Sequence, residues 1–209
     1  MDHFIIFLIL VIFSFIQSIF GVGLLLFGTP TLLIIGYEYH QVLNILLPAS
    51  ITISFLQFKN SKENISKSKK IFNYYCLPIL ISFTFITLLF KNFINFKLII
   101  SAILILSSLY ALNKHKINNL KSILLKHSKI IHAVIGFIHG VSNMGGSFLS
   151  IYHTTINNNK YISRKNISYA YLLMGSFQYI ILLFISYDEL NFIFLYFFLF
   201  SILIFYIAQ

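Results

Sequence analysis

The sequence predicts an all-α protein, a polytopic bundle of transmembrane helices built from two repeated units. Of its 209 residues, 58% are hydrophobic and only 10% are charged, whereas a soluble domain carries about 25% charged residues. The chain has five acidic residues in all, too few to cover a water-facing surface. Long runs without charge give the same indication, because about 20 apolar residues suffice to cross a membrane as a helix.

Seven runs without Asp, Glu, Lys or Arg predict the membrane segments. Five of them have a length suited to one spanning helix. The first and the fifth are too long for one straight helix and slightly short for two. In chain order the runs are Phe4–Tyr37, Tyr39–Phe58, Ile71–Phe90, Leu98–Asn113, Ile130–Asn159, Asn166–Tyr187 and Leu190–Gln209.

Both overlong runs contain a segment that breaks a helix, around Gly21–Gly23 and around Asn143–Gly146. Placing Gly23 on Gly145 brings further residues into register, and the chain downstream matches after a four-residue shift. The matched positions are Gln17 with His139, Ser18 with Gly140, Gly21 with Asn143, and Leu46–Ser50 with Leu172–Ser176. This order of features indicates an internal duplication.

The two predicted units differ in length. The first, residues 1–112, holds a broken run and three ordinary spans, whereas the second, residues 130–209, holds a broken run and only two. The second unit therefore lacks its last span, and residues 113–129 form a basic cytoplasmic linker. In a homo-oligomer a neighbouring copy could supply the missing helix.

The net charge of +10 comes from basic clusters in short loops beside the apolar runs, which is the positive-inside pattern of a membrane protein and not that of a nucleic-acid binder. If each overlong run is a hairpin, all three clusters face the cytoplasm and only Lys91 and Lys97 lie outside. The two units are then inverted relative to each other. If each overlong run crosses once, Lys160, Arg164 and Lys165 move outside, which fits the charge rule less well.

The glycine-containing segments resemble those of the sulfite exporter TauE/SafE family of permeases. The resemblance rests on Gln17–Tyr37, on Leu46–Ser50 and, in the second unit, on the stretch that begins at Gly140 and includes Gly145 and Gly146. It covers nearly the whole chain in segment order. It implies that the protein moves sulfite or a small organosulfur anion across a bacterial plasma membrane.

The breaks themselves favour an anion site. Backbone that leaves a helix inside a membrane is tolerated only where protein or water shelters it, and a restarting helix directs N–H groups and a positive dipole end into the interior. Cation carriers and proton pumps generally place acidic groups in their spans, but all five acidic residues here lie near the N-terminus or in predicted loops. Two restarts facing each other would suit a small oxyanion.

The candidate ligand groups are glycines and neutral polar side chains near the two breaks. For the serines, close packing of spans is the main alternative, and Gly136 with Gly140 favours a packing face. The prolines could simply kink their helices, and Gln17 and Asn143 could brace the broken backbone. The candidates are Gln17, Gly21, Gly23, Thr29, Pro30, Ser50, His139, Asn143, Gly145, Gly146, Ser147 and Ser176, with Ser18, Ser142 and Gln178 beside them.

His139 has two open interpretations: it could carry a proton with the anion, because its pKa lies near physiological pH, or it could be a neutral histidine hydrogen-bonded in the bundle. No cofactor or metal is expected, since Cys76 is the single cysteine and the histidines have no ligand spacing. Two other functional classes stay open, a non-transporting accessory or degenerate subunit and a lipid-modifying membrane enzyme. The enzyme lacks support from any Asp-rich, His-rich or Ser–His–Asp motif.

Overall fold

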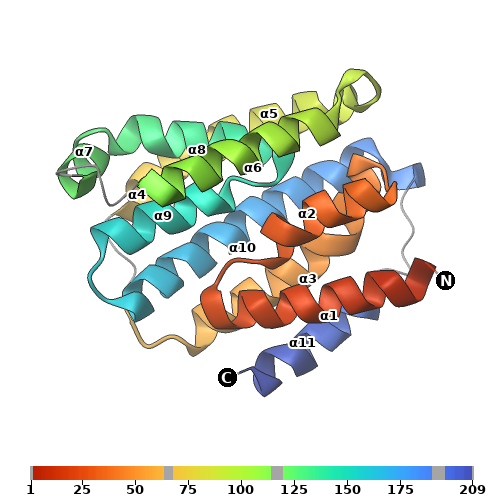
Figure 1. Cartoon of the computed structure of the whole chain (residues 1–209), viewed down its shortest axis with the longest axis horizontal. Coiled ribbons are helices and arrows are strands. Elements are labelled where there is room, and N and C mark those ends of the chain that lie inside the picture. The colour runs from red at the N-terminus through yellow and green to blue at the C-terminus, as the bar shows by residue number, and fades with distance from the viewer. Residues whose placement is uncertain (1, 64–67, 114–119, 190–195, 209) are drawn as a thin grey trace.

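The computed structural model describes residues 2–63, 68–113, 120–189 and 196–208. Within these residues the regular elements are helices without any strand, which confirms the predicted all-α bundle (Figure 1). In chain order they are α1 (Asp2–Phe20), α2 (Leu24–Ile35), α3 (Tyr39–Asn60), α4 (Ser68–Ile71), the π-helical η1 (Phe72–Cys76), α5 (Leu77–Leu89), the 3-10 turn η2 (Lys91–Phe93), α6 (Phe96–Asn113), α7 (Leu120–Lys126), α8 (Ser128–Ser142), α9 (Gly146–Ile156), α10 (Lys160–Ile185), the 3-10 turn η4 (Tyr187–Glu189) and α11 (Phe197–Ile207).

Four helical stretches of the described chain are long and apolar enough to cross a membrane. Shorter apolar helices, α2, α8, α11 and most of α6, pack beside them. The protein is therefore a multi-pass membrane protein. The four stretches are His3–Phe20, Tyr39–Asn60, Lys69–Leu89 and Lys160–Ile185.

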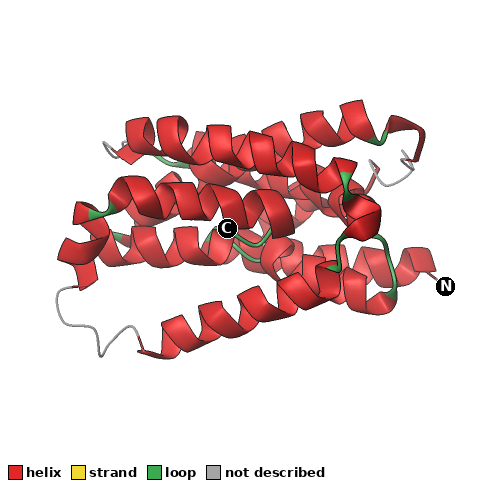
Figure 2. Cartoon of the chain, turned by 90° about the horizontal axis from the view of Figure 1, so that it is seen from above, coloured by secondary structure: helices red, strands yellow, loops and turns green. Residues whose placement is uncertain are grey.

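The centre of the bundle is the antiparallel pair of α3 and α10, whose mutual contact is the most extensive among the described helices (Figure 1). On one side α5 packs against α8 and α10, and on the other α11 packs against α1 and α3. Seen from above in Figure 2, the helices lie side by side along the long axis of the molecule. The long described helices run roughly along one common direction (Figure 1).

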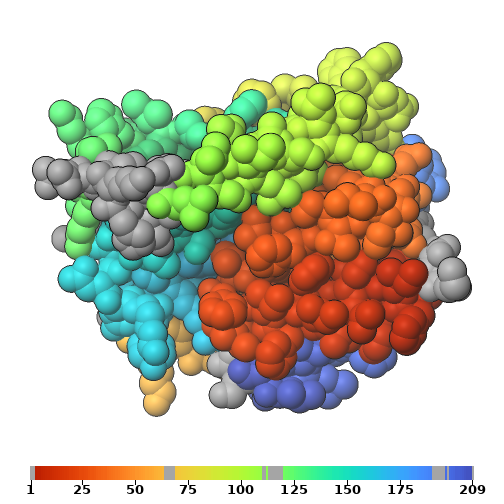
Figure 3. Space-filling view, viewed as in Figure 1, coloured from red at the N-terminus to blue at the C-terminus, as the bar shows by residue number. Residues whose placement is uncertain are grey.

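Large apolar side chains cover the outer surface of the bundle. Much of the face in Figure 3 is formed by α1, α2 and α6. These helices expose large apolar side chains, among them Phe15, Phe27, Leu98 and Leu106. In water such a surface would be unstable, but in a bilayer the lipid tails solvate it.

The first overlong run folds as two antiparallel helices. At Phe20 α1 ends, three residues connect, and α2 returns toward the end of the molecule where the chain began (Figure 1). With 12 residues, α2 is about 18 Å long and cannot cross the membrane alone. It ends where the Gly36 N–H meets the carbonyl oxygens of Leu32 and Leu33, and a capping box between Glu38 and Gln41 starts α3.

The second overlong run has the same form. At Ser142 α8 ends, the chain turns at Asn143–Gly145, and α9 returns beside it (Figure 1). These helices have 15 and 11 residues, so each is too short to span a bilayer.

The basic segments gather at one end of the bundle. There α7, the α9–α10 turn and the C-terminal end of α3 lie together, whereas the α2–α3 turn, η2 and η4 lie at the opposite end (Figure 1). Of the predicted linker 113–129, residues 114–119 lie outside the described residues, and the rest includes α7. Residues 190–195 of the last predicted span also lie outside them.

Candidate substrate site

The first break is a turn that folds back on its own helix. Gly21 has a φ of +82° and donates its N–H to the carbonyl oxygen of Gln17 at 2.8 Å. Gly23 has a φ of +153°, and a Cβ there would lie 2.7 Å from Cγ2 of Ile16. Only glycine tolerates both conditions. The new helix then begins with the Phe27 N–H on the carbonyl of Gly23 at 2.9 Å.

Side chains of α3 brace the end of α1. Nε2 of Gln17 lies 3.1 Å from Oγ of Ser50 and 3.2 Å from Oγ of Ser54. In the opposite direction, Nε2 of Gln57 donates to the carbonyl oxygens of Gln17 at 2.7 Å and Ser18 at 3.0 Å. We call Gln17, Ser50, Ser54 and Gln57 the α1 brace. The side chains of Gln17 and Ser50 are hydrogen-bonded to each other, so their observed contacts are structural.

The second break repeats this geometry. Asn143 has a left-handed φ of +62° and donates its N–H to the carbonyl oxygen of His139 at 2.8 Å. A Cβ on Gly145 would lie 2.6 Å from the Cβ of His139. The Leu149 N–H then bonds to the carbonyl of Gly145 at 3.0 Å and opens α9.

Five buried polar side chains surround the second break, and we call them the central cluster: Thr29, His139, Asn143, Tyr171 and Gln178. Nδ2 of Asn143 lies 3.2 Å from Oγ1 of Thr29 on α2, so this contact joins the two predicted units. Nε2 of Gln178 donates to the backbone carbonyl of His139 at 3.0 Å, and the His139 and Tyr171 rings lie 6.0 Å apart.

Five atoms of the central cluster have no hydrogen-bond partner among the described residues: both ring nitrogens of His139, Oε1 of Gln178, Oδ1 of Asn143 and the hydroxyl of Tyr171. The last two belong to Asn143 and Tyr171. Both side chains are essentially fully buried, at 0% and 1% exposure. Leaving a buried polar group unpaired costs about 1–3 kcal/mol, and such groups in native proteins call for a specific reason.

Gly146 leaves the space that the side chain of Tyr171 fills. A Cβ on Gly146 would lie 1.4 Å from the hydroxyl oxygen of Tyr171 and 2.2 Å from its Cζ. The Tyr171 ring can therefore reach the first turn of α9 only because residue 146 is glycine. The hydroxyl sits against the N-terminal turn of α9, where the positive end of a helix dipole favours an anion.

The structure does not gather all the predicted site residues at one point. Thr29, His139, Asn143, Gly145 and Gly146 lie in or beside the central cluster. The others lie elsewhere: Gln17 and Ser50 form the α1 brace, Gly21 and Gly23 make the first turn, Pro30 is inside α2, Ser147 bonds to the carbonyl of Met144 at 3.0 Å, and Ser176 is half-buried on α10.

The two breaks also lie at different depths. Gly21 packs on Arg164 and Ile167 of α10, whereas the second break contacts Tyr171 and Gln178 further along the same helix. Seven residues of helix, from Arg164 to Tyr171, span about 10 Å. The two restarts therefore do not face each other directly, and Thr29 on α2 makes the link between them.

Gly136 and Gly140 belong to a packing face. A Cβ on Gly136 would lie 2.3 Å from the carbonyl oxygen of Cys76, and one on Gly140 would lie 2.9 Å from that of Leu80. The stretch from η1 into α5 thus approaches α8 at backbone distance, as small residues allow in membrane bundles.

Tyr171 is the central residue that the sequence did not indicate. It lies in the middle of an apolar span, where tyrosines commonly fill the bundle or face lipid. The sequence signal that could have found it is the second of two adjacent glycines, Gly145 and Gly146, since the second glycine makes room for a large side chain from another helix.

These observations define a class: a multi-pass helical membrane protein whose interrupted helices surround a buried polar cluster. The family model described as Sulfite exporter TauE/SafE matches residues 6–209, essentially the whole chain. The protein belongs to this family of membrane permeases. No curated protein and no solved structure matches the chain.

Proposed function

We propose that the protein moves a small oxyanion, sulfite or a small organosulfur anion, across the membrane and binds it at the central cluster. The observation that carries this proposal is the pair of buried, unpartnered polar atoms on Asn143 and Tyr171. A phenol hydroxyl donates readily to an anion. Turning the Asn143 amide by 180° keeps its contact with Thr29, whose hydroxyl then donates, and directs the amide NH₂ into the site.

The charge of the surroundings favours an anion over a cation. The described helices that line the central cluster, α2, α8, α9 and α10, contain no Asp or Glu, and a cation inside a membrane would need such a counter-charge. Neutral donors bind an anion weakly enough to release it on the other side.

Alternating access is supported by where the open spaces lie. One cavity of about 270 Å³ lies at the basic end of α3 and α10 and is lined by Gln57 and Arg164, among others. A second of about 450 Å³ lies at the opposite end, beside His40 and Lys91. The central cluster is packed closed between these depths, so opening one end at a time would connect it to each side in turn.

The two breaks have equivalent hydrogen bonds, which supports the proposed duplication of 1–112 and 130–209. In each, the residue with positive φ donates to the carbonyl four positions earlier, Gly21 to Gln17 and Asn143 to His139. In each, that same carbonyl also accepts a glutamine amide from the third helix of the unit, α3 or α10. The packing of α5 on α8 and α10 corresponds to that of α11 on α1 and α3, as an inverted repeat predicts.

The proposed setting is a bacterial plasma membrane, with the basic end of the bundle in the cytoplasm. This follows from the positive-inside rule applied to the segments around α7 and the α9–α10 turn.

The experiment is uptake of radiolabelled sulfite into vesicles that contain the purified protein, with Tyr171→Phe as the test variant. Removing a hydroxyl that binds substrate should lower kcat/KM about tenfold, mainly through KM. Because the hydroxyl is unpaired in the protein itself, Tm should stay the same or rise.

Tyr152→Phe is the matched control, because the Tyr152 hydroxyl is 2.7 Å from Oγ of Ser128 and lies outside the central cluster. It should lower Tm and leave KM unchanged. Wild-type vesicles with no uptake above protein-free vesicles would support the accessory-subunit alternative, and an unchanged KM in Tyr171→Phe would exclude the central cluster as the site.

A further inference from the structure

The cavity at the basic end of the bundle has features that the central cluster lacks. It lies between the C-terminal end of α3 and the N-terminal end of α10, and its volume is about 270 Å³. Its polar lining includes three basic residues and one acidic residue. These are Lys62, Arg164, Lys165 and Glu63, with Gln57 at the inner wall.

Arg164 is the single arginine of the chain. It is half-buried, and its Nη2 donates to the carbonyl oxygen of Ser18 at the end of α1. That is the one hydrogen bond of the guanidinium group among the described residues, although arginine has five N–H donors in a rigid fork. The stem of Arg164 packs on Gly21, whose Cβ position would be 3.5 Å from Cγ. The first break thus holds a guanidinium group at the cavity wall.

The remaining charges favour an anion in this cavity. Nζ of Lys165 bonds to the carbonyl oxygen of Ser61 at 2.6 Å, which fixes a second positive charge beside Arg164. Lys62 adds a third, and Glu63 opposes only one of them. The cavity at the opposite end has no arginine in its lining, and of its two lysines, Lys91 and Lys97, the first is already paired with the carboxylate of Glu189.

The position of Arg164 connects this cavity with the central cluster. Arg164 and Tyr171 are seven residues apart on α10, which is two helical turns, so they lie on the same face about 10 Å apart along the axis. An anion held at Arg164 would therefore be two turns from the Tyr171 hydroxyl.

We propose that this cavity is a second oxyanion site, in which the Arg164 guanidinium group, with Lys62 and Lys165, binds an anion with two or more oxygens at the cytoplasmic end of the pathway. The proposal rests on the proposed function for the role of the site, as the place where the transported anion waits before it reaches the centre. Its chemistry does not depend on transport, because a planar guanidinium binds paired oxygens in any oxyanion.

Two sources could supply that oxyanion, a free anion or the phosphate of an anionic lipid, and the test separates them. The purified protein in an uncharged detergent is titrated with sodium sulfite and, separately, with inorganic phosphate, against sodium chloride of equal ionic strength. Thermal unfolding reports binding, because a ligand that binds only the folded state raises Tm. The lipid arm compares discs of phosphatidylcholine with and without phosphatidylglycerol.

Arg164→Lys and Lys62→Gln are the test variants, and Lys121→Gln is the control. Lys121 lies on α7 at the same end of the bundle, where it contacts Asn158 and does not line the cavity. We expect the half-saturating sulfite concentration to rise about tenfold in Arg164→Lys, because lysine keeps the positive charge but lacks the planar set of N–H donors of the guanidinium group. Lys62→Gln should weaken binding without touching the Ser18 contact, which controls for a folding defect in the arginine variant.

Each outcome decides a separate claim. Equal weakening by Lys121→Gln, or binding unchanged in both test variants, overturns the site. Stabilisation by phosphatidylglycerol that depends on Arg164, without any by the free anions, supports the site with a lipid phosphate as its ligand.

Binding that depends on Arg164 in a protein that takes up no sulfite would retain this site and refute the proposed transport. Uptake with a normal KM in both variants would refute the site as part of the pathway and retain transport through the centre.

Discussion

At the scale of single residues, two glutamines from the central helices hold the ends of α1 and α8. Nε2 of Gln57 donates to two carbonyl oxygens of α1, and its Oε1 accepts from Oγ of Ser168 at 3.0 Å. Gln178 donates to one carbonyl of α8, and its Oε1 has no partner among the described residues. Both the amide nitrogen and the amide oxygen of Gln57 are therefore hydrogen-bonded, whereas Gln178, a member of the central cluster, retains an unpaired acceptor oxygen.

This difference predicts unequal losses of stability. Gln57→Met removes three hydrogen bonds and should lower the free energy of unfolding by about 2–3 kcal/mol, whereas Gln178→Met removes one bond together with an unpaired acceptor and should cost about 1 kcal/mol or less. Denaturant titration in detergent measures both. Equal losses would contradict the hydrogen-bond assignment on which the comparison of the two breaks depends.

The residue types near the breaks could be predicted from sequence, but their partners could not. Gln17 and Asn143 were open between bracing and ligand contact, and the structure shows Gln17 bonded to Ser50 and Asn143 to Thr29. The choice depended on which side chains of another helix stand opposite. From the sequence alone, Arg164 is one basic residue of a loop cluster. Its contact with Gly21 could not be predicted, because the two residues are far apart in the chain.

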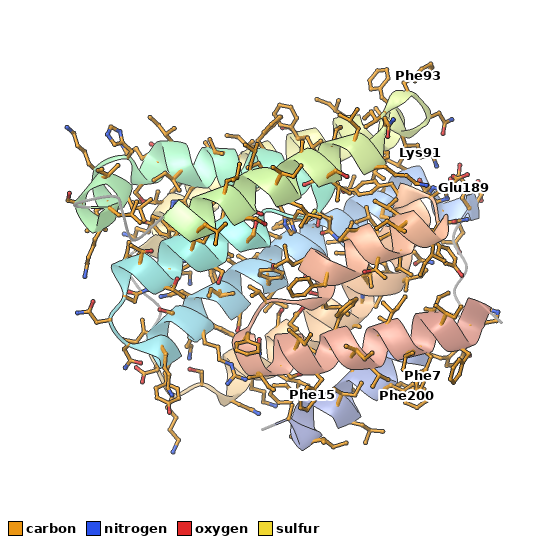
Figure 4. The ribbon with its side chains drawn as sticks, in the orientation of Figure 1. Phe7, Phe15, Lys91, Phe93, Glu189 and Phe200 are labelled. Atoms are coloured by element: carbon orange, nitrogen blue, oxygen red, sulfur yellow. The ribbon has the colours of Figure 1, made fainter. Side chains whose placement is uncertain are left out.

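At the scale of elements, an ion cluster ties together three turns at the end of the bundle opposite the basic segments. Nε2 of His40 in α3 lies 3.2 Å from Oε2 of Glu189, and its Nδ1 lies 3.4 Å from Oε2 of Glu38. Lys91 of η2 donates to the same carboxylate of Glu189 in η4, as Figure 4 shows with both residues labelled. The hydrogen bond from Lys91 holds the pKa of Glu189 below its usual value, and the charges of Lys91 and His40 add to this effect.

The depressed pKa of Glu189 gives a stability term with a definite pH dependence. A carboxyl group with a lower pKa in the folded state stabilises the protein above its unfolded pKa, and this contribution is lost as the pH falls through the folded value. Lys91→Met should therefore lower Tm at pH 7, and the gap to wild type should close below about pH 4. Because Glu189 is half exposed, screening by water limits the effect to less than about 1 kcal/mol.

Tm measured against pH in detergent tests this, with Lys97→Met as the control, since Lys97 lies near the same cavity and has no ion pair among the described residues. A gap that persists unchanged at pH 3, or one of the same size in Lys97→Met, would contradict the role given to the Lys91–Glu189 pair.

Most elements follow from the sequence, because runs without charge set where chain can lie in a membrane. The overlong runs end their first helices at Phe20 and Ser142, beside the glycine and asparagine that can adopt positive φ. The π-helical turn Phe72–Cys76 was not predicted. It precedes Pro78, which has no N–H to donate, and a proline of this kind allows the preceding turn to widen.

At the scale of the whole molecule, the two proposed units are unequal. The first unit ends with α6, which packs against α2, α8 and α9, and the second has no described helix in the corresponding place. The count of apolar runs predicts unequal units, whereas the depth offset between the two breaks follows only from the packing along α10.

The orientation of the whole bundle can be tested because Cys76 is the only cysteine and is buried. In a Cys76→Ser background, single cysteines replace residues at the two ends of the bundle, and intact cells are treated with a maleimide that cannot cross the membrane. We expect labelling of Lys97→Cys and Asp188→Cys from outside. Lys62→Cys and Lys121→Cys should react only after the cells are made permeable.

Lys160→Cys is the variant that separates the two topologies. If α8 and α9 form a hairpin that returns to the cytoplasmic side, as their antiparallel packing indicates, Lys160→Cys is protected in intact cells. If the run Ile130–Asn159 crosses the membrane once, Lys160→Cys reacts from outside, and Arg164 and Lys165 lie on that side as well. Because Lys62 and Arg164 line the same cavity, that result together with a protected Lys62→Cys would contradict the basic cavity itself, as well as the inverted repeat and the cytoplasmic oxyanion site.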